Sequence, residues 1–242
     1  MKTLVLTAGV WPTEKEAKDK MRIYMASCKK FGICPNLYVV GRQFPGYRAL
    51  CLDYQLEYLK TVPTEYTHII FSDGWDCFFT APLEEIIGKY VRLGSPEILC
   101  SAFYQLGNVS DAEKDYPNCF DDSIRYRYPN RGAYIAEREA IIDAFERMLR
   151  LPRQTGDDAF NWYDLWATGW RPMLDSNCEI FQVATDDCVI AEPEDYPLRP
   201  RRLYNQHTKS WPCVWHHSGG FSHQSHGKDD RMIPWAKKLE II

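Results

Sequence analysis

Short apolar runs alternate with longer amphipathic stretches through the first hundred residues. Runs typical of β-strands occupy residues 4–6, 37–40, 68–71 and 97–100. Stretches rich in helix-forming residues lie between them, at 13–31, 47–60 and 82–93. The run at 68–71 is apolar nearly throughout, as expected of a central strand that is covered on both faces. Three successive strand–helix units predict right-handed crossovers and a mainly parallel sheet.

Local signals support two of these helices. Thr13 is a suitable N-cap residue for the first one, with Glu16 at the capping-box position. In the second, Leu52, Leu56 and Leu59 are spaced to form one buried face. The start of one helix and the buried side of the other are thus predicted from neighbouring residues alone.

The pattern changes after residue 103. Residues 105–129 are polar, aromatic and irregular, which is typical of a long loop over a binding site. Further elements are predicted as a strand at 132–136, a helix at 137–149, a short helix at 157–166 and a strand at 179–182. About forty residues at the end resemble an extended tail. We predict an α/β fold in one domain, residues 1–242, because this length often closes around a single sheet.

Composition narrows the class of protein. Hydrophobic residues make up 45% of the chain and charged residues 26%, as in ordinary globular domains. The net charge of −4 does not suit a protein that coats nucleic acid, although residues 199–209 form a local basic stretch. The nine cysteines include no CxxC pair, so we interpret them as thiols in a reducing, cytoplasmic setting. No apolar run approaches ~20 residues, and no membrane span is expected.

An acidic turn follows the strand at 68–71. Asp73 and Asp76 flank Gly74 and Trp75 directly after this strand. Ligands of open parallel sheets bind at the carboxyl ends of the strands, so the two carboxylates are placed to face one cation. Oxygen ligands favour Mg²⁺ or Mn²⁺, and an added imidazole favours Mn²⁺. The alternative interpretation is that Asp73 caps a turn and Asp76 lies on the surface.

Trp75, between the two aspartates, also has two interpretations. A flat indole ring can stack on a nucleotide base, or it can pack in the core beneath the turn. The sequence favours neither of them.

Signature motifs of three other enzyme classes are missing from the sequence. No GxGxxG follows the first predicted strand, and there is no GxxxxGK[ST] and no GxSxG. The sequence therefore argues against a dinucleotide-binding fingerprint, against P-loop phosphoryl transfer and against the nucleophile elbow of an α/β-hydrolase.

Six short segments occur in the order found in one enzyme family. The first is residues 71–76 (FSDGWD). The others are residues 100–102 (CSA), 126–135 (YRYPNRGAYI), 156–158 (GDD), 174–182 (LDSNCEIFQ) and 214–219 (VWHHSG). Together they resemble the glycosyltransferase domain of the procollagen lysyl hydroxylase family. The Asp-x-x-Asp segment of that family matches the segment at 71–76. The resemblance spans nearly the whole chain, from Leu4 to about residue 220.

This resemblance implies a GT-A (Rossmann-like) fold with a mixed, mainly parallel central sheet, and a UDP-sugar donor bound with Mn²⁺ or Mg²⁺. By matched position, Asp73, Asp76 and His216 would be the metal ligands, and Trp75 would stack on uracil. The rest of the nucleotide-sugar site would include Thr7, Ala8 and Gly219, together with Asp73. Residues 1–103 would then form a nucleotide-binding half, and residues 104–242 an acceptor half with a tail that closes the metal site.

The acceptor side is implied less closely. The resemblance places Asp157 and Asp158 beside the sugar and the acceptor, as the catalytic pair. Phe103 stands where the family has Glu, and residues 130–133 (NRGA) replace Asn-Ser-Gly-Gly. Two more differences, His217 and Ser218, replace Gly and Asn. These differences leave the acceptor open.

Two classes of function fit the sequence. The first is a hexosyltransferase that moves a sugar from a UDP-sugar to an acceptor hydroxyl. That hydroxyl belongs to hydroxylysine in a collagen-like protein, to a surface polysaccharide, or to a hydroxymethylated pyrimidine in the DNA of a virus or phage. The last suits an enzyme of the infected cytoplasm, and the basic stretch at 199–209 is compatible with it. The second class is a nucleotide-sugar-binding module without turnover, which would not need the acidic pair.

The C-terminal histidines allow a separate interpretation as a zinc site. His216, His217, His223 and His226 are irregularly spaced and lack a nearby cysteine pair. A single metal-binding histidine is therefore favoured.

Overall fold

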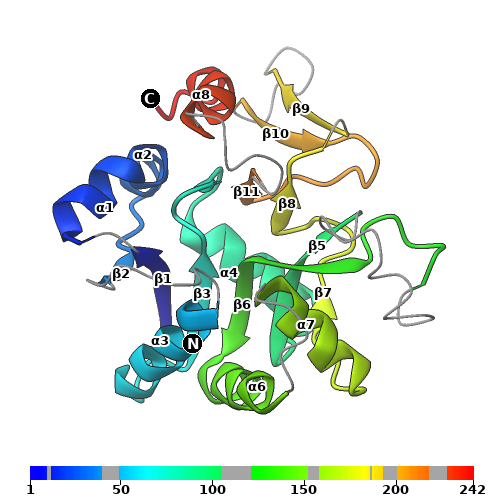
Figure 1. The fold of residues 1–242 in the computed structure, drawn as a ribbon. Helices are drawn as coiled ribbons and strands as arrows, with labels where there is room; N and C mark the ends of the chain where they lie inside the picture. Colours follow the sequence, from blue (N-terminus) through cyan, green and yellow to red (C-terminus); the bar gives the residue numbers. More distant parts are fainter. Residues whose placement is uncertain are drawn as a thin grey trace.

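A mixed six-stranded sheet forms the centre of the computed structural model (Figure 1). Its strand order is β2-β1-β3-β6-β5-β7. The residues that the structure describes are 1–9, 12–39, 49–104, 121–151, 158–185, 187–192, 201–217 and 228–242. The strands of this sheet are β1 (Thr3–Gly9), β2 (Asn36–Val39), β3 (His68–Ser72), β5 (Ile98–Phe103), β6 (Tyr128–Glu137) and β7 (Met173–Leu174).

Strand directions confirm the mixed, mainly parallel sheet that the sequence predicts. The pairs β1–β2, β1–β3 and β5–β7 are parallel. Only β6 is reversed, because it pairs antiparallel with both β3 and β5. The carboxyl ends of β1 and β3 therefore lie at the same edge of the sheet, where ligands of such sheets bind.

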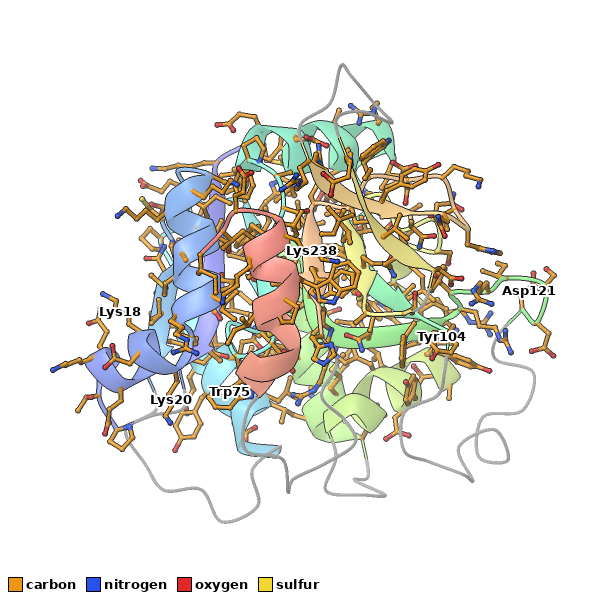
Figure 2. The ribbon with its side chains drawn as sticks, turned by 90° about the horizontal axis from the view of Figure 1, so that it is seen from above. Lys18, Lys20, Trp75, Tyr104, Asp121 and Lys238 are labelled. Atoms are coloured by element: carbon orange, nitrogen blue, oxygen red, sulfur yellow. The ribbon has the colours of Figure 1, made fainter. Side chains whose placement is uncertain are left out.

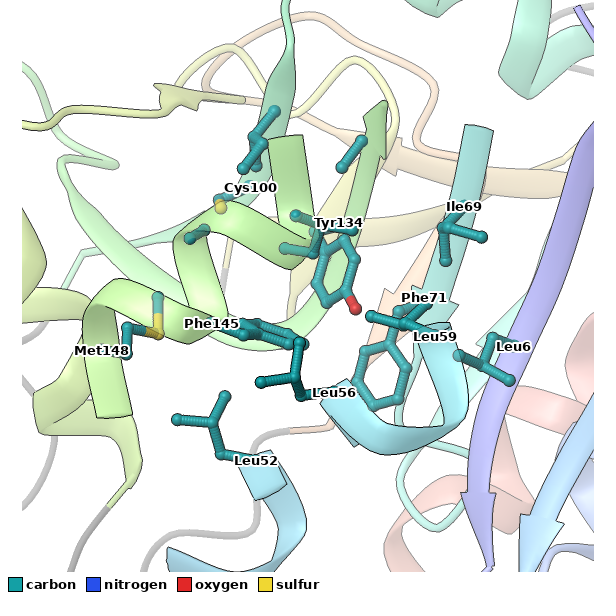
Figure 3. Close-up of a cluster of buried hydrophobic side chains, with 14 of the residues drawn as sticks. Leu6, Leu52, Leu56, Leu59, Ile69, Phe71, Cys100, Tyr134, Phe145 and Met148 are labelled. Atoms are coloured by element: carbon teal, nitrogen blue, oxygen red, sulfur yellow. The ribbon is translucent and has the colours of Figure 1, made fainter. Parts of the chain in front are cut away.

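One face of the sheet is covered by three helices: α3 (Ala49–Thr61), α6 (Arg138–Arg150) and α7 (Asp158–Ala167). The three leucines predicted to form the buried side of α3 all lie in this cluster. Tyr134 of β6 packs among them and stacks on Phe71, with ring centroids 5.2 Å apart (Figure 3). Its buried hydroxyl accepts a hydrogen bond from Gln55 Nε2 at 2.7 Å, so the one polar atom of the ring is satisfied.

The other face is covered by α1 (Glu14–Lys20), α2 (Arg22–Lys30) and α4 (Leu83–Arg92). Successive residues of β1 alternate between the two sides, with Leu4 and Leu6 in the first cluster and Val5 in the second. This alternation in a strand with apolar residues on both sides confirms that the centre of the sheet is buried on both faces.

Two small sheets lie above the carboxyl edge of the central sheet (Figure 1). One has three strands in the order β4-β11-β8, namely β4 (Cys77–Phe79), β11 (Val214–His216) and β8 (Phe181–Val183). The other is the antiparallel pair of β9 (Cys188–Ala191) and β10 (Arg202–Asn205). β4 is not predictable from the sequence pattern, because three buried residues that follow a turn show no period of their own.

The prediction of an extended C-terminal tail is wrong. Besides β10 and β11, this part of the chain forms the helix α8 (Lys228–Lys238). Met232, Ala236 and Leu239 share a buried cluster with Trp215 of β11 and with Ile23 of α2. Their spacing of four and three residues puts them on one side of α8 and of the turn that follows it. This side is buried only because β11 and α2 pack against it.

The predicted helix at 13–31 is interrupted at Met21, which separates α1 from α2. The N-cap prediction is confirmed, since Thr13 Oγ1 accepts from the backbone N–H of Glu16 at 3.2 Å. Across the break, Met21 N–H donates to Ala17 and Met25 N–H donates to Met21, both at 2.9 Å. The change is therefore confined to one residue, whose side chain is buried against the sheet.

Asp175 anchors the segment that leads into β8. Its buried carboxylate accepts backbone N–H bonds from Glu179, Ile180 and Phe181 at 2.7–2.9 Å. Burial raises the pKa of this carboxyl to about 6, against the opposing effect of the three hydrogen bonds. Asp175 thereby sets the path of the chain toward the small sheet.

This raised pKa predicts how stability depends on pH. The folded-state value lies above the ordinary one, so the protonated group favours the fold; that stability is complete below about pH 4 and is lost as the pH rises through about 6. The Asp175→Asn variant loses hydrogen bonds but does not titrate. Its deficit in unfolding free energy relative to the wild type should narrow by about 2 kcal/mol between pH 4 and pH 7. Urea unfolding of both proteins at several pH values measures this, and a constant difference would contradict it.

Candidate functional site

The acidic turn lies at the carboxyl edge of β1 and β3. Residues 73–76 form a tight turn between β3 and β4, in which the N–H of Cys77 donates to Asp73 O at 2.8 Å. Gly74 N–H donates to Thr7 Oγ1 at 2.8 Å, which ties the turn to the end of β1. Asp73 N–H donates to Gly132 O at 2.8 Å, which ties it to β6. The turn is therefore held by the two strands that flank β3.

Two glycines let the backbone segments approach one another here. A Cβ on Gly74 would lie 2.4 Å from Met21 Sδ and 2.7 Å from Thr7 Oγ1. A Cβ on Gly132 would lie 2.1–2.6 Å from three ring atoms of His216. Real Cβ atoms do not make such contacts, so the imidazole occupies the space that a side chain at position 132 would need.

β11 brings His216 to Asp76. Strands β4 and β11 pair antiparallel, with His216 opposite Cys77. The N–H of His217 donates to the backbone O of Asp76 at 2.7 Å. His216 Nε2 then lies 3.3 Å from Asp76 Oδ1. Both residues are buried, at 5% and 4% exposure. The sequence interpretation that Asp76 is a surface residue is thus wrong.

The geometry around Asp76 and His216 fits a divalent cation. Two ligand atoms about 2.1 Å from one octahedral cation lie about 3 Å apart, close to the 3.3 Å observed. His216 Nδ1 is buried without a hydrogen-bond partner among the described residues, which is uncommon for a ring nitrogen. Asp76, Cys77 and His216 each offer one ligand atom within 4.8 Å of the other two. A carboxylate and an imidazole are ligands that Mn²⁺ and related ions accept.

A comparison with known protein families shows the family of this chain. The family model described as the PLOD GT domain, the glycosyltransferase domain of the lysyl hydroxylase family, matches residues 2–225. The chain belongs to this family. It is therefore a glycosyltransferase, and the resemblance drawn from the six segments is confirmed. No curated protein matches the chain.

One of the similar solved structures shares the overall fold. A glycosyltransferase "involved in the glycosylation of the major capsid of PBCV-1" is similar over 100% of both chains, with 11% identity and a TM-score of 0.52. At this identity the similarity concerns the fold, which is of the GT-A type predicted. A 4-diphosphocytidyl-2C-methyl-D-erythritol synthase from Anaerococcus prevotii is 15% identical, over 67% of this chain and 84% of its own, with a TM-score of only 0.37.

The structure does not bring all three predicted metal ligands of this glycosyltransferase equally close. Asp76 and His216 meet, as described. Asp73 is half-buried, and its Oδ1 accepts from the backbone N–H of Trp75 at 3.2 Å, as in an Asx turn. The third potential ligand in the buried cluster is Cys77. Turn capping by Asp73 is thus observed, and a metal bond to Asp73 stays a prediction.

The predicted nucleotide-site residues lie around the same edge. Thr7 is fully buried and its hydroxyl binds the turn, while Ala8 beside it is half-buried. Trp75 is half-buried and reaches solvent (Figure 2), so it is not enclosed in the core beneath the turn. Gly219 lies outside the described residues.

The predicted acidic pair is only partly described. Asp158 begins α7, which confirms a helix start near this position, and Asp157 lies outside the described residues. Helix α7 packs against α6 and β6. Of the other C-terminal histidines, His223 and His226 also lie outside the described residues, so a four-histidine zinc site stays untested.

Two residues of the site, Gly132 and Cys77, were not predicted as site residues. Gly132 was expected to begin a strand and to lie within a family motif, and Cys77 was expected to be a small buried residue, which it is. A glycine inside a predicted strand signals close approach of another group, and this signal was present at position 132. Nothing in the sequence near Cys77 indicates that His216 lies opposite it.

Within the described residues, no helix is long and apolar enough to cross a membrane.

The close contact at Gly132 predicts a specific cost of adding one methyl group. Gly132→Ala should displace the His216 ring and lower the unfolding free energy by about 1–3 kcal/mol. Gly88→Ala is the matched control, because its Cβ would meet Arg92 Nη1 at an ordinary 3.7 Å in the middle of α4. That variant should gain about 0.5–1 kcal/mol from helix propensity. Denaturant unfolding of both measures the contrast, and equal stabilities would refute the contact.

Proposed function

We propose that this glycosyltransferase transfers a hexose from a UDP-sugar to an acceptor hydroxyl and depends on Mn²⁺ or a similar cation. The observation that carries the proposal is the buried Asp76–His216 pair, 3.3 Å apart at the carboxyl edge of β3. A buried carboxylate opposite an imidazole is costly to build and is explained by a cation that both can bind.

In this proposal Asp76 and His216 would hold the cation, with Asp73 next to them in the turn, and its charge would neutralise the diphosphate leaving group. Trp75 offers a partly exposed ring for stacking on uracil. Thr7 holds the turn at Gly74, so that the base and the phosphates meet a fixed backbone. Ala8 and Gly219 complete the nucleotide-sugar site.

The acidic pair acts on the acceptor side. We assign to Asp157 and Asp158 the orientation of the sugar and the removal of the proton from the acceptor hydroxyl. General-base assistance of this kind accelerates a reaction by about 10²–10⁴-fold. The pair separates an enzyme from a module that only binds the nucleotide sugar, since binding alone needs no base.

For the acceptor we propose a hydroxyl on a protein, with hydroxylysine as the candidate that the family suggests. Involvement of the PBCV-1 glycosyltransferase in capsid glycosylation supports a protein acceptor. The alternative, hydroxymethylated DNA, relied on the basic stretch at 199–209. Arg201 pairs with Glu192 at 2.6 Å, and the buried Arg202 binds both oxygens of Glu85 at 2.7–3.0 Å. These two charges are engaged within the protein, which weakens the case for phosphate binding.

A reducing, cytoplasmic setting remains part of the proposal. The seven cysteines whose side chains the structure describes are free thiols, which supports that setting.

Metal dependence is tested at Asp76. Asp76→Ala and His216→Ala should each lower Mn²⁺-dependent turnover of UDP-glucose or UDP-galactose by at least about 100-fold, because each removes a ligand of the cation. Asp143→Ala on α6 is the control, since this exposed carboxylate only pairs with Arg147. Release of UDP with and without Mn²⁺ measures the effect. Full activity of Asp76→Ala, or turnover that persists in EDTA, would refute the metal assignment.

The catalytic role is tested at the acidic pair. Asp158→Asn retains a side chain able to cap the start of α7, so the melting temperature should change little. If the pair is catalytic, transfer in at least one of Asp157→Asn and Asp158→Asn should fall by about 10²-fold or more while UDP still binds. Product formation by mass spectrometry and UDP affinity by calorimetry give both values. Transfer within about threefold of the wild type in both variants would favour the module without turnover.

A further inference from the structure

Cys77 lies beside Asp76 and His216, the proposed metal ligands, and has no role in the proposed transfer reaction. In the antiparallel pairing of β4 with β11 it is directly opposite His216, so the two side chains lie on the same face of the small sheet. Its Sγ is within 4.8 Å of a ligand atom of Asp76 and of one of His216. Three different donor atoms, an oxygen, a nitrogen and a sulfur, thus meet at one buried point.

A single cysteine does not make a metal site, but a second potential ligand, His216, lies next to Cys77. His216 is 5% exposed, and its Nδ1 has no hydrogen-bond partner among the described residues. The backbone of Gly132 lies against the same ring and leaves no room for another side chain. The imidazole is therefore fixed in position next to the thiol.

The hydrogen bond between the thiol and Gly132 is weak. Cys77 Sγ donates to Gly132 O at 3.4 Å, and a thiol is a poor donor. The side chain is fully buried among apolar neighbours that include Val5, Ile70 and Ala133. Metal binding would replace this weak bond, and the apolar surroundings strengthen the attraction between a cation and a thiolate.

We propose that Asp76, Cys77 and His216 form a Zn²⁺ site that competes with the catalytic cation. Thiolate ligands select zinc over manganese and magnesium, which prefer oxygen. Three protein ligands of mixed type leave one position of a tetrahedral zinc for water. The thiol proton is released to solvent on binding.

The consequence is inhibition. Zinc bound through Cys77 also occupies Asp76 and His216, and the catalytic cation is excluded from both. Only this consequence rests on the proposed function, because zinc binding itself needs no substrate and no turnover.

The decisive test uses Co²⁺ as a probe for zinc, added to the metal-free protein. A sulfur-to-cobalt charge-transfer band in the near ultraviolet should appear with one equivalent and be removed by Zn²⁺. The band should be lost in Cys77→Ser, which retains a polar side chain, and in Cys77→Val, which retains a side chain of similar bulk. The control is the triple variant Cys34→Ser, Cys51→Ser and Cys119→Ser, which should keep the band. Cys34 is included because it is exposed and is the first candidate for adventitious binding.

Two results would overturn the zinc site: no band in the wild type, or a band that persists in a folded Cys77 variant. Inhibition gives a second measure. The Zn²⁺ concentration for half-inhibition of Mn²⁺-dependent transfer should rise at least about tenfold in Cys77→Val, relative to its own activity without zinc. A cobalt band on Cys77 in a protein whose transfer is independent of Mn²⁺ would remove the proposed metal-dependent mechanism and leave the zinc site supported.

Discussion

The contact between the Gly132 backbone and the His216 ring joins the two halves of the site. Gly132 lies in β6, beside the carboxyl end of β3, and its carbonyl also accepts the N–H of Asp73. His216 ends β11 of the small sheet, and the residue after it donates to Asp76 O. The turn after β3 is thus held between two strands that reach it from different parts of the chain. A side chain at position 132 would push the imidazole away from Asp76.

Holding β11 in register requires anchors outside the site. Lys89 and Arg202, both buried, share the carboxylate of Glu85: Lys89 Nζ lies 3.1 Å from Oε1, and Arg202 Nη1 lies 2.7 Å from Oε2. Lys89 Nζ also donates to the carbonyls of Glu179 and Trp211, which lie just before β8 and β11. These bonds offset part of the cost of burying the three charges, and they fix the strand that carries His216.

Metal choice at this corner follows from which donors a cation engages. Asp76 and His216 are common to both proposed ions. The oxygen ligand of the turn, Asp73, completes a set that suits manganese, whereas Cys77 completes one that suits zinc. Asp73 Oδ1 accepts a hydrogen bond from the backbone of the turn, and Cys77 Sγ makes a weak hydrogen bond to Gly132 O. The same pair of residues is therefore open to a hard and to a softer cation.

Much of the fold and part of the site could be predicted from local patterns. The apolar runs of β1 and β3, the Thr13 cap, the buried side of α3 and the position of the acidic turn after β3 all depend on residues close in sequence. The alternation of strands and helices is also visible in the local sequence, and it predicts the mainly parallel sheet. Family membership was also predicted, because short motifs keep their order along the chain.

Only the tertiary structure decided the rest, because it depends on pairing between distant segments. β4 is three residues long and exists because β11 pairs with it. The same pairing buries Asp76, places His216 against Gly132 and turns Cys77 from a small apolar residue into a neighbour of both. Helix α8 likewise has a buried side only because β11 and α2 cover it. A sequence records which residues are apolar or acidic, but hydrogen bonds and close contacts between strands far apart in the chain determine which of them meet.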